Sequence, residues 1–374
     1  MKLRNPGVLG RTELISVIRG ASPIITTIRT GGIRDDQIET SAVNLTIGSR
    51  VYGMSRMTLP QPGQKIEELV AQADYDFDLA EGQLGFLHKN YTYLIPLNET
   101  VQLPKGFTAT FSPRSSIGRV DVFVRVLADG VPLYDRLPDE YCGKLWLEVT
   151  PLSFCVRVFP GLSMTQMRLK LGDARLTSQE VRIRQAKDGI LWNQDGTPVK
   201  PQELRGASHG IYMHVDLKRD IVGFRSRRSA PPLSLNASGS YDPDDFWEPI
   251  RRPKNGRIDL EPGEFCLLAT SEAVRIPKDV CGEIMPYDAA AGEFRTHYAG
   301  YFHPGFGGEK GTIGVLELRG RESSHSLSDG QPICLMAFEH LCSPLSEGYD
   351  GEYTDPRPSL SKFFDRRLGV WEGI

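Results

Sequence analysis

A short loop in the first third of the chain combines side chains that suit an anion. Arg114 and Arg119 stand five residues apart and flank two hydroxyls, Ser115 and Ser116. Guanidinium groups present forked N–H donors that match phosphate oxygens, and hydroxyls add further donors. The loop therefore predicts a local phosphate-binding site. The alternative is a solvated turn whose arginines only face water.

The sequence lacks the signals of a protein-bound metal. No cysteine forms a C-x-x-C pair or stands at metal-ligand spacing from a histidine. We therefore expect six reduced thiols, in the core or at the surface, and no metal site: Cys142, Cys155, Cys266, Cys281, Cys334 and Cys342.

The elements that must position the arginine loop occur twice. Leu79 to Ser116 can be laid over Leu260 to Ala289, with Val101 and Pro113 meeting Val274 and Pro286 at an offset of 173. Further on, the offset is 169, as between Leu147-Glu148 and Leu316-Glu317. Two copies indicate two similar globular domains, because a solenoid needs more repeats. Only the first copy keeps the loop, since the second has these residues in its place: Tyr287, Asp288, Ala289 and Gly292.

Length and composition agree with this organisation. A chain of 374 residues is long enough for two or three domains. The net charge is −3 with both signs interspersed, so nothing indicates a broad nucleic-acid surface, and any phosphate recognition must be local. No apolar run approaches the roughly 18 residues of a membrane span, and no apolar signal segment opens the chain. We therefore expect a cytoplasmic protein without a membrane partner.

Short apolar segments bounded by Pro or Gly dominate both copies, which favours a β-sandwich or barrel over alternating strands and helices. A short helix is predicted at Thr12 to Ile18. We predict four parts: repeat 1 at residues 1–170, a connecting segment with a hairpin at 171–205, repeat 2 at 206–345, and a tail at 346–374.

The chain resembles the dCTP deaminase family, in a double-length form with two tandem copies. In the first copy the resemblance lies in Arg114–Arg119, Leu145–Val149 and Phe159–Gly161, with Gln37–Gly48 similar to the family's early strand. In the second copy it lies in Ala299–Phe302, Pro304–Phe306, Val315–Leu318 and Asp329–Cys334, and Tyr349–Tyr353 is similar to the segment that folds over the nucleotide.

The resemblance implies a mainly β chain with two tandem dUTPase-like domains, each a distorted jelly-roll or β-barrel with few short helices. It implies a homo-oligomer, with a trimer favoured and with active sites between neighbouring domains. The implied reaction is the hydrolytic deamination of dCTP at C4 of the ring, giving dUTP and ammonia for pyrimidine deoxynucleotide biosynthesis. Mg²⁺ would bind through the triphosphate, and whether dTTP inhibits is left open.

Zinc-dependent base deaminases need H-x-E and P-C-x-x-C to activate water, and this chain has neither. A carboxylate must then act as general base and acid. Glu148 is the candidate, because it lies among large apolar residues, where burial raises its pKa and an adjacent cation lowers it. The alternative is an outward-facing strand residue.

The resemblance assigns the remaining roles. Arg119 is the cation beside Glu148, and Ser115 with the backbone of Ala128 holds the water. Arg114 and Ser116 bind phosphate. Substrate contacts are also expected from residues of the tail: Tyr349, Tyr353 and Lys362. Glu317 of the second copy, without its loop, is expected to be structural, so we predict one working site per chain.

Two other functions remain open. dUTPases activate water with an aspartate where the second copy has His303 and the first has Pro138, although Asp135 or Asp139 could substitute. A dUTPase or a bifunctional dCTP deaminase/dUTP diphosphatase is therefore the first alternative, and the residue that binds the sugar 3′-hydroxyl stays open with it. The second is a non-catalytic nucleotide-binding regulator, which the presence of Glu148 disfavours.

Overall fold

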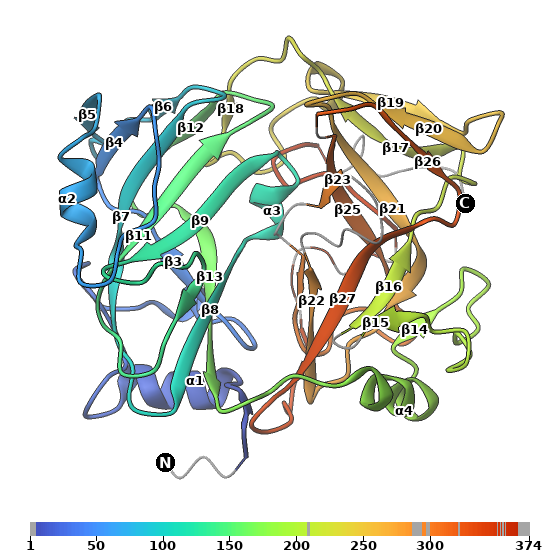
Figure 1. The fold of residues 1–374 in the computed structure, drawn as a ribbon, viewed down its shortest axis with the longest axis horizontal. Coiled ribbons are helices and arrows are strands. Elements are labelled where there is room, and N and C mark those ends of the chain that lie inside the picture. The colour runs from blue at the N-terminus through green and yellow to red at the C-terminus, as the bar shows by residue number, and fades with distance from the viewer. Residues whose placement is uncertain are drawn as a thin grey trace. The chain divides into compact units, whose positions relative to one another are not determined.

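The chain folds into two compact units built mainly of antiparallel strands (Figure 1). The computed structural model describes residues 5–207, 210–285, 294–296, 300–320, 322–349, 351, 353, 355 and 357–365. The first unit comprises Met1–Ala174, Pro231–Ala237 and Leu341–Ser343, and the second comprises Arg175–Ala230, Ser238–His340 and Pro344–Ile374. None of the helices in the described ranges has the length and apolar character needed to cross a membrane.

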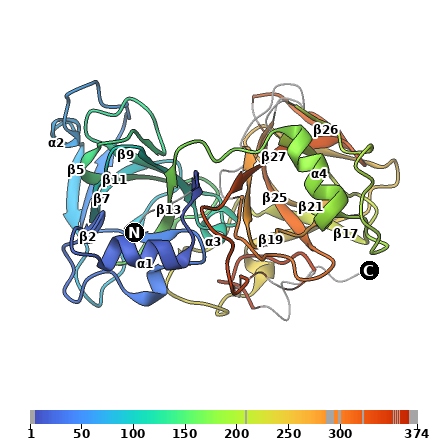
Figure 2. The ribbon, with the colours of Figure 1, turned by 90° about the horizontal axis from the view of Figure 1, so that it is seen from below.

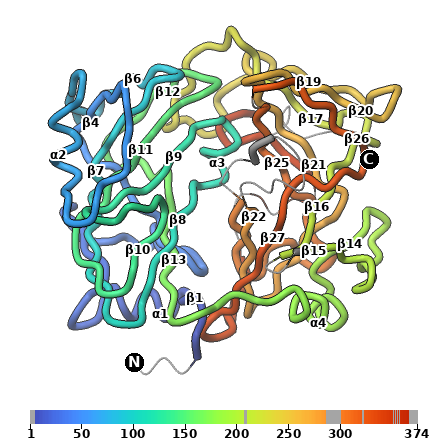
Figure 3. Tube along the Cα trace, in the orientation of Figure 1, coloured from blue at the N-terminus to red at the C-terminus, as the bar shows by residue number. Residues whose placement is uncertain are grey.

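The first unit contains three sheets. Their strand orders are β1-β13-β8-β10 with β3 on β13, β5-β4-β7-β11-β9 with β2 on β7, and β18-β12-β6. Figure 3 shows β10 beside β8. The elements are β1 (Gly7–Val8), α1 (Arg11–Arg19), β2 (Ile25–Thr27), the 3₁₀ turn η1 (Asp35–Gln37), β3 (Val43–Thr46), β4 (Arg50–Met54), α2 (Ile66–Val70), β5 (Tyr75–Asp78), β6 (Gly85–Leu87), β7 (Thr92–Gln102), β8 (Phe107–Pro113), α3 (Ser115–Gly118), β9 (Val122–Ala128), β10 (Arg136–Leu137), β11 (Cys142–Pro151), β12 (Val156–Val158), β13 (Ser163–Leu171) and β18 (Leu233–Ser234).

The second unit repeats this plan. Its sheets run β19-β17-β21-β25-β23 with β14 on β21, β15-β16-β27-β22-β24, and β20-β26. The elements are α4 (Ser178–Asp188), β14 (Leu191–Trp192), β15 (Gly206–Ala207), β16 (Gly210–His214), β17 (Ile221–Ser226), the 3₁₀ turn η2 (Pro243–Asp245), β19 (Trp247–Arg251), β20 (Arg257–Leu260), β21 (Phe265–Val274), β22 (Val280–Met285), β23 (Phe294–Thr296), β24 (Tyr301–Phe302), β25 (Thr312–Gly320), β26 (His325–Ser328) and β27 (Pro332–His340).

Strand register confirms the internal repeat at the offsets found in the sequence. Ile95 of β7 pairs with Leu147 of β11, and Leu268 pairs with Leu316 in the second unit. Likewise, Phe111 pairs with Met167, and Ile284 pairs with Met336. Because a shift of one residue would turn every side chain to the other face, matched register means that both units bury the same positions.

The upstream end of the predicted overlay is wrong. Leu87 pairs with Val156 in the first unit, and Leu260 pairs with His325 in the second, so Leu87 and not Leu79 occupies the place of Leu260. Leu79 and Leu87 are both leucines and lie on the two sides of the same Gly-containing turn, so the sequence pattern alone does not distinguish them.

A carboxylate that links two sheets also recurs in both units. Glu99 of β7 accepts hydrogen bonds from Thr46 N and Thr46 Oγ1, each at 2.8 Å. Glu272 of β21 accepts from His214 N at 3.1 Å and also pairs with the His214 ring. Each carboxylate thus joins its central strand to the neighbouring sheet, and burial raises the pKa of Glu99 despite its hydrogen bonds.

The helix predicted at Thr12 to Ile18 is confirmed as α1, but residues 175–205 are more than a connector. They form α4 and β14, which belong to the second unit (Figure 2). Thr177 and Glu180 form a capping box at the start of α4, and Gly189 ends it in the left-handed region at φ 64°. Val181 and Leu191 join the hydrophobic core of this unit, and the hairpin expected in the segment follows β14.

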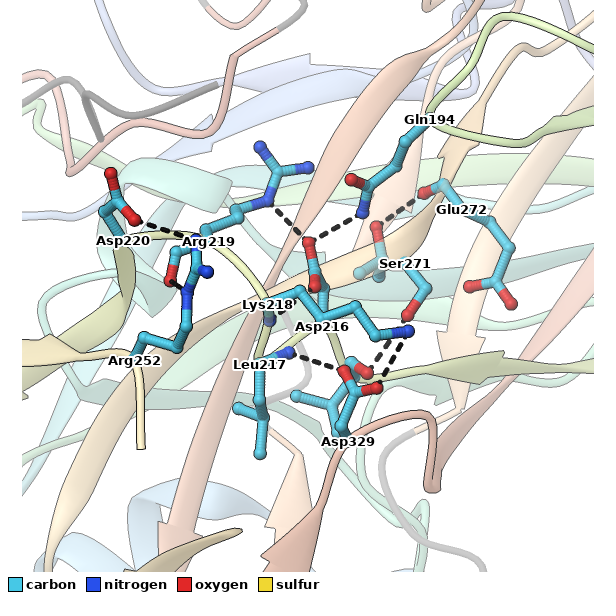
Figure 4. A network of polar contacts seen from close by, with 12 residues as sticks. Gln194, Asp216, Leu217, Lys218, Arg219, Asp220, Arg252, Ser271, Glu272 and Asp329 are labelled. Carbon is cyan, nitrogen blue, oxygen red and sulfur yellow. Dashed lines mark hydrogen bonds and ion pairs between the residues drawn. The ribbon is translucent and has the colours of Figure 1, made fainter. Parts of the chain in front are cut away.

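A network of hydrogen bonds and ion pairs connects that hairpin to the rest of the second unit (Figure 4). Asp216, which is 2% exposed, accepts hydrogen bonds from Gln194 Nε2 at 2.6 Å and from Arg219 Nε at 2.7 Å. Nearby, Asp329 accepts from Leu217 N and pairs with Lys218. A buried carboxylate is stable only with such partners, so these contacts hold the hairpin and two turns as one structure.

Candidate active site

Glu148 lies in the middle of β11, opposite Arg125 of β9 on one side and Leu94 of β7 on the other. Its side chain shares a sheet face with that of Trp146, because residues two apart on a strand point the same way. Leu94 and Trp146 belong to an apolar cluster under α2, and Glu148 is 7% exposed. The predicted catalytic carboxylate is therefore buried and does not face solvent.

Tyr134 contacts this carboxylate directly. Its hydroxyl donates to Glu148 Oε2 at 2.7 Å, and its ring packs against the same apolar cluster. Tyr134 belongs to the lengthened segment between β9 and β10, in which no sequence motif singles out a tyrosine. Among the described residues, none donates a hydrogen bond to the other oxygen, Oε1.

Arg125 supplies the cation beside Glu148. Its guanidinium lies over the Tyr134 ring, 4.4 Å from the ring centre, and it forms an ion pair with Asp135. Asp135 also accepts a hydrogen bond from Val126 N at 2.7 Å. The resemblance assigned this role to Arg119, but the positive charge that acts on Glu148 within the chain is that of Arg125.

These contacts set the protonation of Glu148. Burial raises the pKa of its carboxyl group, while the Tyr134 hydrogen bond and the charge of Arg125 lower it, and the balance leaves the pKa above its ordinary value. Burial and the nearby Glu148 charge also raise the pKa of Tyr134, so its hydroxyl keeps its proton. A carboxylate whose pKa is raised in this way is better suited to accept a proton and return it than an exposed glutamate is.

The arginine loop forms α3 and its caps. Arg114 precedes the helix and Arg119 ends it. Arg114 has a half-buried side chain, 3.9 Å from Glu39, which is a long ion pair. Ser116 and Arg119 are buried, and Ser115 is partly exposed. Of the two arginines, Arg114 is thus the more available to an anion.

Ser115 and Ala128 lie near opposite ends of β9. The helix α3 leads into the strand β9 (Figure 1). The first residue of β9, Val122, pairs with Pro151, and Ala128 at the other end pairs with Leu145. Six residue steps along a strand span about 20 Å. The Ala128 carbonyl also accepts a bond from Val131 N at 3.2 Å. The described contacts of one chain therefore do not bring Ser115 and Ala128 together.

The three tail residues lie in the second unit. Tyr349 stacks on His303 with ring centres 4.9 Å apart, and its ring packs on the core of this unit. The Tyr353 hydroxyl accepts a hydrogen bond from Lys362 N at 3.2 Å. The structure thus brings Tyr353 and Lys362 together, and their proposed contacts with substrate stay predictions.

In the second unit, Glu317 takes the place of Glu148. It pairs with Leu267, as Glu148 pairs with Leu94, and it is equally buried. The residues predicted to replace the arginine loop, at 287–289 and 292, lie outside the described residues. His303 follows β24 as Pro138 follows β10, which supports the alignment of these two positions.

The described part of the chain contains no group of three His, Cys, Asp or Glu side chains that could hold a metal ion. All six cysteines are free thiols, and four of them are buried.

Two sequence profiles cover nearly the whole chain. That of "2′-deoxycytidine 5′-triphosphate deaminase (DCD) N-terminal domain" matches residues 5–173. That of "2′-deoxycytidine 5′-triphosphate deaminase (DCD), C-terminal domain" matches residues 178–364. The boundary between them coincides with the boundary between the two structural units near residue 175.

Individual proteins agree with the profiles. The crystal structure of 2′-deoxycytidine 5′-triphosphate deaminase from Agrobacterium tumefaciens matches with a TM-score of 0.81 and 29% identity, covering 90% of this chain and 100% of that one. A "dCTP deaminase, dUMP-forming" of Coprothermobacter proteolyticus is 26% identical over 140 residues, 37% of this chain and 71% of the relative. A "dCTP deaminase" of Halorubrum lacusprofundi is 26% identical over 134 residues, 36% of this chain and 63% of the relative.

The structural match confirms the predicted mainly β, dUTPase-like fold. Together with the two profiles, it also confirms the double-length form. The chain therefore belongs to the dCTP deaminase family of hydrolytic enzymes.

Proposed function

We propose that this protein deaminates dCTP hydrolytically with Glu148 as its general base and acid. The observation that carries the proposal is the buried, singly hydrogen-bonded carboxylate of Glu148 in a member of this family. Water attacks C4 of the cytosine ring as Glu148 takes its proton. Glu148 then gives this proton to the ring nitrogen beside C4. It next takes the proton of the new C4 hydroxyl and passes it to the amino group, whose bond to C4 breaks, so that dCTP and water give dUTP and ammonia.

The arginine loop is proposed to bind the triphosphate. Among the described residues, the Arg114 side chain has a long ion pair with Glu39, and an incoming phosphate offers it a stronger, forked contact. Ser116 adds a hydrogen-bond donor to the phosphate site. Ser115 is assigned to the water, and Arg119 is assigned to the reacting carboxylate. Mg²⁺ prefers phosphate oxygens and waters as ligands, so we assign it to the triphosphate.

The separation of Ser115 from Ala128 supports a site shared between copies of the chain. If both act on one water, as the family resemblance implies, two copies must contribute them to one site. A closed ring of three copies satisfies this requirement at every site, so we keep the trimer as part of the proposal. The cytoplasmic location belongs to the same proposal, since free nucleotides are the substrates.

Formation of dUMP is the second candidate outcome, because the Coprothermobacter relative and others are named dUMP-forming. Asp135 is a poor base for that second step. One of its carboxylate oxygens accepts from Val126 N and the other pairs with Arg125. Asp139 is exposed, and within the described part of the chain it accepts a long hydrogen bond of 3.4 Å from Gly106 N. We therefore favour dUTP as the product.

Two assays test the proposal, each with and without Mg²⁺. The first measures ammonia and pyrophosphate release from dCTP, and the second measures pyrophosphate release from dUTP. Ammonia without pyrophosphate supports deamination to dUTP, and equal amounts of both support dUMP formation. Pyrophosphate from dUTP without ammonia from dCTP would identify a dUTPase. Nucleotide binding without either product would instead support the regulator.

A further inference from the structure

The hydroxyl of Tyr134 donates a hydrogen bond to one oxygen of Glu148, the carboxylate that must transfer protons in the proposed reaction. We propose that Tyr134 is a positioning residue, which holds Glu148 Oε2 so that Oε1 alone exchanges protons with water and the ring. The inference rests on the proposed function, because it assigns the reacting atom of that same carboxylate. It does not make Tyr134 a catalytic residue, since Tyr134 acts through Glu148.

The loop that carries Tyr134 is fastened at both ends. On its N-terminal side, Asp129 accepts a hydrogen bond from Ile66 N at 2.9 Å, and Gly130 N donates to Gln64 O at 2.8 Å. On its C-terminal side, Asp135 binds Val126 N, and its own carbonyl accepts from Phe111 N at 3.0 Å. Tyr134 therefore approaches Glu148 from a fixed backbone.

The ring of Tyr134 is held as well. Arg125 lies across from Glu148 in the register of β9 and β11, and its guanidinium covers the Tyr134 ring. Asp135 pairs with that guanidinium and so prevents it from turning towards Glu148 as a competing donor. The order Asp135, Arg125, Tyr134, Glu148 is thus a chain of contacts in which each side chain fixes the next.

The other neighbours of Glu148 named above are uncharged, so the contacts of Tyr134 and Arg125 control whether Glu148 is ionised. β9 contributes Arg125, and the loop contributes Tyr134 and Asp135. β7 presents the apolar Leu94, and Trp146 beside it is also uncharged. A hydroxyl that donates to the ionised carboxylate stabilises that form, so its removal raises the pKa of Glu148 further.

The variant Tyr134→Phe keeps the ring on Arg125 and removes only the donor. We expect the acidic limb of the kcat profile for dCTP deamination to move to higher pH by about one unit. At pH values well below the wild-type pKa of Glu148, kcat should then be about tenfold lower than in the wild type, with little change in KM. Tyr141→Phe is the matched control, because the Tyr141 hydroxyl donates to the carbonyl of Lys144 and not to a carboxylate.

A second readout separates this inference from the proposed function. The ¹³C resonance of the Glu148 carboxyl group reports its titration without any turnover, in the wild type and in both tyrosine variants. A shift of the Glu148 pKa to higher pH in Tyr134→Phe alone supports the positioning role, even if the wild type releases no ammonia and the function fails. An unchanged Glu148 titration in folded Tyr134→Phe, or an equal shift in Tyr141→Phe, would overturn it.

Discussion

At the scale of single residues, the protonation of Glu148 is set by opposing effects of known sign. Burial favours the neutral acid, whereas the Tyr134 hydroxyl and the Arg125 charge favour the carboxylate. The sequence alone identified Glu148 as an acid among apolar neighbours. It did not identify Tyr134 or Arg125, because their contacts depend on the path of a loop and on strand register, which no local pattern specifies.

The raised pKa of Glu148 gives a pH dependence to the reaction. General-base catalysis needs the ionised form, so activity should be lost as pH falls through this pKa. Because the pKa lies above the ordinary value for a glutamate, the loss should begin at a higher pH than an exposed glutamate would give. The kcat profile between pH 4 and 8 measures it. An acidic limb at the value of an exposed carboxyl would contradict the burial argument.

At the scale of elements, the strands were more predictable than the helices. Matching offsets in the sequence showed that the segments of β7 and β11 have counterparts in β21 and β25, and the structure shows that both pairs of strands are hydrogen-bonded in the same register. The helix α4 was missed because only Val181 and Gln185 of it are buried, and most of its other residues are charged or polar. Its place in the second unit depends on tertiary packing and on the network around Asp216, which links residues distant in the sequence.

That network makes a prediction about stability. Asp216→Ala should lower the free energy of unfolding of the second unit by about 3 kcal/mol, because it leaves Arg219 buried without its partner. Asp220→Ala is the control in the same turn. Its ion pair with Arg252 is exposed and should contribute at most about 1 kcal/mol. Urea unfolding of both variants measures the difference, and equal losses would show that the buried network is not stabilising.

At the scale of the whole molecule, the two units share a fold and differ in their loops. Both retain a buried glutamate at the same register position, Glu148 and Glu317. The sequence could show this duplication, because aligned apolar positions survive in both copies. It could not show that residues 231–237 and 341–343 return to the first unit, since short segments such as β18 join a sheet only through long-range pairing.

The proposed sharing of sites between copies can be tested by mixing two variants. Glu148→Gln removes the base, and a double change, Arg114→Ala with Ser115→Ala, disables the loop. If each site takes its base and its loop from different copies, mixed oligomers contain some sites with both parts intact. Unfolding and refolding the two variants together should therefore restore part of the dCTP deaminase activity. If verified mixed oligomers recover no deaminase activity, the base and the loop of each site come from the same copy of the chain.

Ammonia release from dCTP by the wild type, Glu148→Gln and Glu317→Gln tests the central claim most directly. The two variants change the same residue type at the same position of the two units, so a general effect on folding should appear in both. We expect Glu148→Gln to lower kcat by about 10²- to 10⁴-fold while nucleotide binding persists, and Glu317→Gln to stay near the wild type. Near-normal turnover by Glu148→Gln would contradict that claim.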